Sequence, residues 1–210
     1  IIDKSGGTVM TQINGHIDSC VKLSGVPDLT MSFVNPRLLD DLSFHPCVRL
    51  KRWENERIIS FIPPDGNFRL LSYTVGSHSV VSMPLHVRHT VNIGASCATG
   101  ASTVGRLDIS VSPRPNIGRL VEDVHISMHM PKQVLNCMLT ANQGRYTFEP
   151  TTRILSWYIG RLETMSPVKL ATLRGSVSLQ PSTAVANNPD INLSFTVNQL
   201  AISGARVSRL

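Results

Sequence analysis

The sequence predicts an all-β protein, most simply a sandwich of antiparallel sheets that each bury one face. Apolar residues recur at every second position in most of the 210-residue chain, which is the period of a half-buried strand. Clusters of Pro, Gly, Asn and Asp interrupt these runs, as turns do. No long segment repeats its apolar residues with the 3.6-residue period of a helix.

The first strand is expected within 9–23, where the odd positions are mostly apolar and the even positions mostly polar. Because this run is long for one strand, Gly15 is expected to mark a bulge or bend. A second strand is predicted where Leu29, Met31 and Phe33 alternate with polar residues. A short helical turn is allowed near 35–42.

Residues 47–73 are predicted to form a strand, a turn, a strand, a tight turn and a further strand. The β-prone segment 58–62 is followed by Pro64-Asp65-Gly66, in which proline presets φ and glycine tolerates a positive φ. Phe68 and Leu70 are expected to return along the partner strand.

The remaining strands show the same alternation. The apolar sets are Leu85, Val87, Val91 and Ile93; Leu107, Ile109 and Val111; Leu120, Val124, Ile126, Met128 and Met130; Val177 and Leu179; and Ile191, Leu193, Phe195 and Val197. Turns are predicted at 113–116, 142–144 and 187–190, and flexible loops at 94–105 and 180–188.

Composition excludes several classes of protein. Hydrophobic residues make up 41% of the chain and charged residues only 16%, which suits a packed core and not a disordered chain. No apolar run approaches the length that spans a bilayer. The net charge of +6 permits an acidic partner, but aromatic residues, at 5%, are too few for the stacking platforms of a single-strand nucleic-acid binder. One basic cluster stands out, namely Arg49, Lys51, Arg52 and Arg57.

No arrangement of residues indicates catalysis or a resident metal or cofactor. Phosphate-binding glycine loops and nucleophile elbows are absent from the sequence. His125 and His129 share one face of a predicted strand, where solvent-facing histidines are favoured over a zinc site. Cys20 is on the polar face of the first strand, and His16 is too distant along an extended strand to activate it.

The four cysteines are widely spaced and form no CxxC pair. They are interpreted as reduced thiols of a cytosolic protein: Cys20, Cys47, Cys97 and Cys137.

Several segments resemble one family closely. The stretch 57–73, "RIISFIPPDGNFRLLSY", resembles the signature of the medium (mu) chains of clathrin-associated adaptor complexes. Residues 15–27 are similar to the family's "G…LSGxP" strand and turn. The segments 35–47, 51–54 and 199–210 look most like the mu chain of adaptor complex 3, and the resemblance covers essentially the whole chain.

This resemblance implies an elongated mu-homology domain made of two immunoglobulin-like sandwiches, one inserted in the other. Residues 1–79 and 200–210 would form the signal-binding subdomain A, and residues 80–199 the inserted subdomain B.

The resemblance also implies a function without enzymatic activity. The family recognises Tyr-x-x-Φ sorting signals, with Φ a bulky apolar residue, in cytosolic tails of membrane proteins. The peptide is held as an added strand, with one pocket for each of the two side chains. Val207 and Leu210 match the Φ pocket. Cys20 stands where relatives in other adaptor complexes carry a lysine beside the tyrosine pocket, so it is expected to line the pocket without ion pairing, and Lys22 is a candidate electrostatic substitute.

Two strands of the family's pocket are expected outside this sequence, one before Ile1 and one after Leu210. The implied partners are cargo tails and the other adaptor subunits, namely two large chains and a small chain. An anionic membrane is a further candidate partner, contacted by the basic cluster. The implied location is cytoplasmic, peripheral on Golgi and endosomal membranes and transport vesicles, with delivery to lysosome-related compartments.

Three alternatives remain open at this point. A mu-like scaffold would bind other adaptor subunits or regulators and no tyrosine signal. A nucleic-acid binder is motivated only by the net charge. A hydrolase has no supporting motif.

Overall fold

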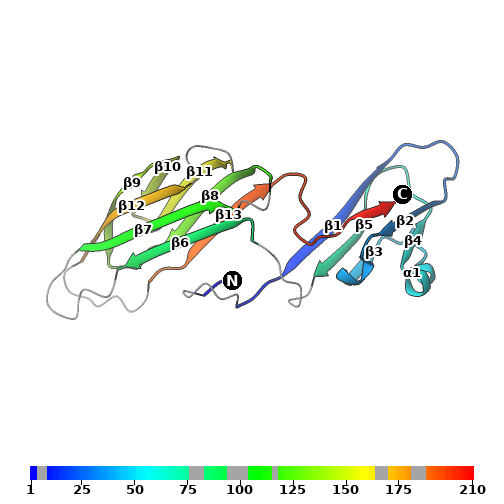
Figure 1. Cartoon of the computed structure of the whole chain (residues 1–210), viewed down its shortest axis with the longest axis horizontal. Helices are drawn as coiled ribbons and strands as arrows, with labels where there is room; N and C mark the ends of the chain where they lie inside the picture. Colours follow the sequence, from blue (N-terminus) through cyan, green and yellow to red (C-terminus); the bar gives the residue numbers. More distant parts are fainter. Residues whose placement is uncertain (4–8, 76–82, 94–103, 115–117, 164–169, 181–187) are drawn as a thin grey trace. The chain divides into compact units, whose positions relative to one another are not determined.

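A computed structural model describes residues 1–3, 9–75, 83–93, 104–114, 118–163, 170–180 and 188–210. The chain divides into two compact units, Ile1–Ser82 with Ala201–Leu210 (unit 1) and Met83–Leu200 (unit 2) (Figure 1). Most of the predicted loops 94–105 and 180–188 fall outside the described residues. The all-β prediction is confirmed in both units.

Unit 1 is a sandwich of two three-stranded sheets in its described part. One sheet has the order β1-β5-β3 and the other β14-β2-β4, with antiparallel neighbours. The elements are β1 (Ile13–Val21), β2 (Leu29–Phe33), a 3₁₀ turn (Pro36–Leu38), β3 (Asp40–Phe44), α1 (Leu50–Glu56), β4 (Ile58–Phe61), β5 (Gly66–Val75) and β14 (Val207–Arg209).

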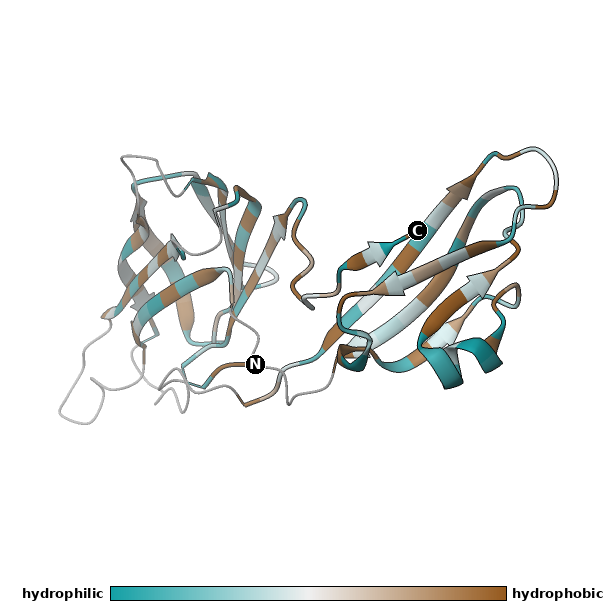
Figure 2. Cartoon of the chain, turned by 45° about the vertical axis from the view of Figure 1, so that its right-hand side comes forward, coloured by the Kyte–Doolittle hydropathy of each residue, from teal (hydrophilic) through white to brown (hydrophobic). Residues whose placement is uncertain are grey.

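The alternation read from the sequence builds the core of unit 1. Along β1 the odd positions face inward and the even positions are exposed, as predicted. Met31 and Phe33 of one sheet and Leu71 of the other are buried in a common cluster. Figure 2 shows the resulting change of hydropathy from residue to residue along the strands.

The prediction of a strand at the start of 47–73 is wrong, because residues 50–56 form the helix α1. Trp53 is 4% exposed and contacts the rings of Phe33 and Phe44 edge-on, so this short helix is fixed by one large buried side chain. Arg57 ends the helix in a left-handed conformation with φ 57°, and its amide donates to the Trp53 carbonyl.

The turn before β5 is where it was predicted, and Gly66 has φ 93°. However, β4 and β5 are not partners. β4 pairs with β2, and β5 pairs with β1 and β3 in the opposite sheet. The turn therefore carries the chain from one layer of the sandwich to the other.

Gly15 does not mark the irregularity of β1, which lies between Ile17 and Asp18. Gly15 is opposite Tyr73, and a Cβ atom there would lie 2.2 Å from the Tyr73 ring. The glycine is needed because an aromatic ring covers the backbone at this point.

Unit 2 is a sandwich of two four-stranded sheets in its described part, with the orders β10-β11-β8-β13 and β6-β7-β12-β9. Its strands are β6 (Leu85–Asn92), β7 (Val104–Pro113), β8 (Val121–His129), β9 (Val134–Ala141), β10 (Arg145–Glu149), β11 (Ile154–Leu162), β12 (Ala171–Leu179) and β13 (Ile191–Val197). Trp157, fully buried, lies in the core between the sheets.

The alternation predicted across 120–130 needs one correction. Val121, not Leu120, is buried at the start of β8, and Val124 follows it three positions later. Asp123, at φ 51°, lies between them and shifts the register, as a bulge does.

Candidate functional site

Two edge strands define the candidate site in unit 1. In the described part of the chain, β1 pairs only with β5, and β14 pairs only with β2. Each therefore presents one row of backbone amides and carbonyls that no described strand occupies. Such an edge can take up a further strand.

Tyr73 places these two edges on the same flank of the sandwich. Its ring extends from β5 over Gly15 of β1, and its hydroxyl is 2.8 Å from the Ser203 hydroxyl, in the segment that leads into β14. Ala205 packs on the unit 1 core. Figures 1 and 2 both show β14 beside β1.

Val207 and Leu210 lie at the exposed edge and not in the core. Val207 is 48% exposed and pairs with Phe33 of β2, and Leu210 is 78% exposed just beyond β14. The hydroxyls of Ser208 and Ser32 are 2.8 Å apart and tie the short strand to its neighbour. Two apolar side chains are thus open to a ligand at the end of β14.

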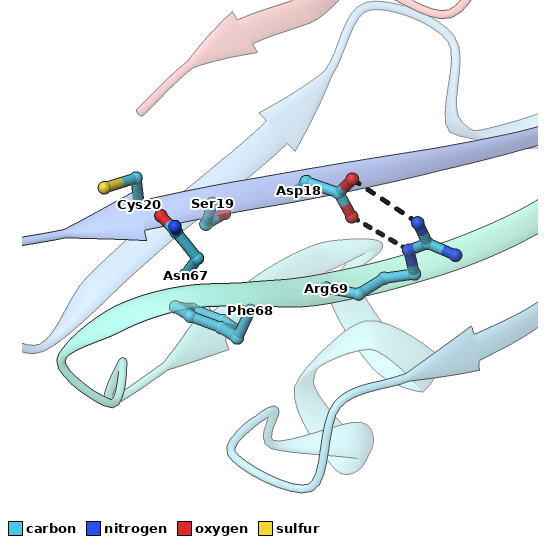
Figure 3. A pocket seen from close by; sticks show the side chains of 6 residues that line it. All are labelled: Asp18, Ser19, Cys20, Asn67, Phe68 and Arg69. Carbon is cyan, nitrogen blue, oxygen red and sulfur yellow. Dashed lines mark hydrogen bonds and ion pairs between the residues drawn. The ribbon is translucent and has the colours of Figure 1, made fainter.

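Cys20 is exposed on the outer face of β1. It belongs to the sheet opposite the one that contains Val207. Lys22 is exposed one residue after the end of β1. Cys20 is opposite Asn67 of β5 in the register. Cys20 is one of six residues that line a shallow depression on this face of the sheet (Figure 3). The lining residues are Asp18, Ser19, Cys20, Asn67, Phe68 and Arg69.

An ion pair borders this depression. Arg69 Nε donates to Asp18 Oδ1 at 2.8 Å, and His16 Nε2 is 3.4 Å from the other carboxylate oxygen. The hydrogen bond from Arg69 is the largest cause that lowers the pKa of Asp18, and the same bond raises the pKa of Arg69. The side chains are more than half exposed, so the pair orders the surface more than it stabilises the fold.

Sequence reasoning did not identify Asp18, Arg69 or Tyr73 as site residues. Asp18 and Arg69 are 51 positions apart, and only the β1–β5 register brings them together. The one signal in the sequence that pointed to Asp18 is that it lies two positions before Cys20, so both side chains are expected on the same face of the strand.

Two of the described thiols, Cys47 and Cys137, are in surroundings that disfavour the thiolate. Cys47 and Cys137 are free, and burial raises the pKa of both thiols, that of Cys137 to about 11. This is the opposite of an activated nucleophile. Among the described residues, no group of three or more His, Cys, Asp or Glu is placed to hold a metal ion. Cys97 lies outside the described residues.

The basic cluster lies on and around α1, and three of its four members have partners within the protein. Arg49 donates to Asp28 Oδ1 and to Ser60 Oγ, both at 2.7 Å. Arg52 pairs with Glu56 at 3.3 Å, and the Arg57 guanidinium stacks over the Trp53 ring at 5.4 Å. Lys51 is exposed. The contact with an anionic membrane stays a prediction, and the two ion pairs reduce the net positive charge that is available for it.

No helix in the described part of the chain combines the length and the apolarity required to cross a bilayer.

The candidate site in unit 1 thus has two main features. These are a pair of open strand edges, β1 and β14, and the exposed apolar side chains of Val207 and Leu210 at the end of β14.

Comparison with known proteins places this geometry in a family context. The model of the adaptor complexes medium subunit family matches residues 1–210. The chain is 53% identical to AP-3 complex subunit mu-1 of Gallus gallus, 52% to that of Homo sapiens and 54% to AP-3 complex subunit mu-2 of Homo sapiens. Each alignment covers 100% of this chain and 49% of the relative, so the chain spans about half the length of these proteins.

A solved structure shares the fold. The Fcho1 mu homology domain of Danio rerio, determined with a bound Eps15 peptide, superposes with a TM-score of 0.62 at 16% identity, over 88% of this chain and 71% of that one.

Proposed function

The chain belongs to the adaptor complexes medium subunit family, and from this premise we propose that unit 1 binds Tyr-x-x-Φ peptides from cytosolic tails of membrane proteins. The family assignment makes it part of an adaptor subunit and not an enzyme. The observation that carries the proposal is the pair of open edges, β1 and β14, with exposed apolar side chains at the end of β14.

The proposed complex divides its contacts between backbone and side chains. The peptide lies extended on the open flank and forms main-chain hydrogen bonds, which are independent of its sequence. The Φ side chain packs on Val207 and Leu210, and the tyrosine ring lies beside Cys20, with Lys22 close to it. Burial of each side chain contributes roughly 1.5–3 kcal/mol, part of which is offset by ordering the tail. A single signal is thus expected to bind weakly, and clustering on a membrane adds avidity.

This function places the protein in a larger assembly. We propose that it acts with two large chains and a small chain on cytosolic vesicle and endosomal membranes, and that it sorts cargo from Golgi and endosomes toward lysosome-related compartments. The relatives named AP-3 complex subunits support the assembly, and the peptide bound to the Fcho1 domain supports peptide recognition by this fold.

Substitution of Val207 tests the proposal. In calorimetric titrations, Val207→Ser is expected to weaken binding of a Tyr-x-x-Leu peptide by about 5- to 30-fold, because about 1–2 kcal/mol of apolar contact is lost. The matched control is Val104→Ser in unit 2, whose valine is 53% exposed against 48% for Val207. The control should bind as the unmodified protein does.

Peptide variants separate this function from the scaffold alternative. Two variant peptides are compared, one with alanine in place of the tyrosine and one with alanine in place of the Φ residue. Each should lose most of the binding. The domain would be identified as a scaffold by two results together. It would bind adaptor subunits or regulators, and it would show no affinity for the tyrosine peptide or for either of its alanine variants.

A further inference from the structure

The outer face of one sheet in unit 2 has a charge pattern that the proposed function does not use. In the described strands β6, β7, β12 and β9, the charged residues are Arg88, Arg106, Arg174 and a single acid, Asp108. The described strands of the other sheet carry two arginines and three acids. The basic excess of unit 2 strands is therefore confined to one sheet.

The single acid on this face is already partnered. Arg174 Nε donates to Asp108 Oδ1 at 3.0 Å, and the Asp108 side chain is only 27% exposed. Arg106 lies on the same strand as Asp108, two positions away, and is exposed. Its guanidinium is thus available to an anionic group brought by a ligand.

A shallow groove runs across this charged face. Its walls include Arg106, Met138, Thr140 and Arg174, and the register aligns Arg106, Ser176 and Met138 in one row across three strands. Gly175 helps to form its floor. A Cβ atom at Gly175 would lie 2.2 Å from the Met138 carbonyl oxygen, so only glycine lets the two strands approach this closely.

Met138 gives the groove an apolar contact beside the positive charge. Its side chain is 67% exposed, whereas Met128 and Met130 are buried in the core of the same unit. A thioether is polarisable, adapts to different shapes and makes favourable contacts with aromatic rings. The groove thus offers a cation and a soft apolar surface in one row.

From this pairing we propose that the groove is a second peptide-binding site, which takes an acidic segment containing one aromatic residue. A carboxylate of the peptide pairs with Arg106, and the aromatic ring lies on the Met138 thioether. A peptide fits better than a membrane surface, because three arginines, one of them paired, attract anionic lipid weakly. Arg106 and Met138, by contrast, lie in one row across three strands and can contact two side chains of the same peptide.

Methionine methyl resonances test the proposal directly. The full chain, with its seven methionines labelled with ¹³C at the methyl carbon, is titrated with the peptide Gly-Ser-Glu-Glu-Phe-Glu-Ser-Gly. The Met138 signal, identified by its absence in Met138→Leu, should shift upfield through the ring current of the phenylalanine. Peptides with Lys for Glu, or with Ala for Phe, should not produce this shift.

Charge reversal supplies the second measurement. Arg106→Glu should weaken the affinity at least 10-fold, while Arg145→Glu, on the other sheet of unit 2, should leave it unchanged. An unmoved Met138 signal, equal affinity in Arg106→Glu, or a shift seen only with phosphatidylserine vesicles would overturn the proposal. Val207→Ser should not affect this site, so failure here and failure of the tyrosine-signal proposal are separable.

Discussion

Tyr73 is the residue on which the geometry of the open flank most depends. It is 8% exposed, covers Gly15 on β1 and reaches Ser203, which in turn accepts a hydrogen bond from the Ala205 amide at 3.3 Å. The side chain therefore links the edge of one sheet to the segment that leads into the edge of the other.

Removal of the Tyr73 hydroxyl should measure this link. We expect Tyr73→Phe to lower the free energy of unfolding by about 0.5–1.5 kcal/mol, because a partly buried hydrogen bond is lost while the ring is retained. Tyr158→Phe is the control, since Tyr158 is 45% exposed and its hydroxyl is 3.4 Å from Asp123. Equal urea midpoints for Tyr73→Phe and the unmodified protein would show that the contact does not hold the flank.

Cys137 makes stability depend on pH in the alkaline range. Burial raises the pKa of its thiol from 9.0 to about 11, so the folded protein keeps the proton at a pH where the unfolded chain has lost it. The stabilisation is complete below pH 9 and is lost as the pH rises toward 11.

The expected loss from Cys137 is roughly 2 to 3 kcal/mol over this range. In Cys137→Ala the free energy of unfolding should fall less steeply between pH 9 and 11, whereas Cys20→Ala, which changes an exposed thiol, should keep the original slope. Parallel pH profiles of Cys137→Ala and the unmodified protein would refute this assignment.

At the scale of elements, the sequence predicted strands well wherever one face of the strand is buried and the other face is exposed to solvent. β1, β2, β7 and β13 follow the alternation directly, because a register error of one residue would expose every apolar side chain.

The helix α1 was missed for a physical reason. Seven residues span two turns, which is too short for a 3.6-residue period to emerge. Its local signals were the Arg52–Glu56 pair at i, i+4 and the single apolar Trp53 that anchors it.

Sheet membership could not be predicted from strand periodicity. The segment from β4 to β5 has the turn chemistry of a hairpin, yet the two strands lie in opposite sheets. Turn residues specify a local change of direction, whereas the partner of a strand depends on the whole sandwich. The candidate site was limited in the same way, because Asp18 and Arg69 meet only through long-range pairing.

At the scale of the whole molecule, two units of one chain present different surfaces. Unit 1 offers open strand edges with apolar side chains, and unit 2 offers a basic sheet face with a shallow groove and an exposed methionine. In our account, unit 1 recognises a signal through added backbone pairing and two side chains. The groove of unit 2 would bind its own ligand through charge and one aromatic contact.

Strand addition is the central claim, and amide hydrogen exchange with and without a Tyr-x-x-Leu peptide tests it most directly. The peptide should slow exchange in the segments that contain β14 (207–209) and β1 (13–21), because their edge amides gain partners or lose contact with water. Exchange in the unit 2 strands β7 and β12 should not change. Binding of the peptide without slower exchange in either edge strand, or with protection confined to unit 2, would contradict the account.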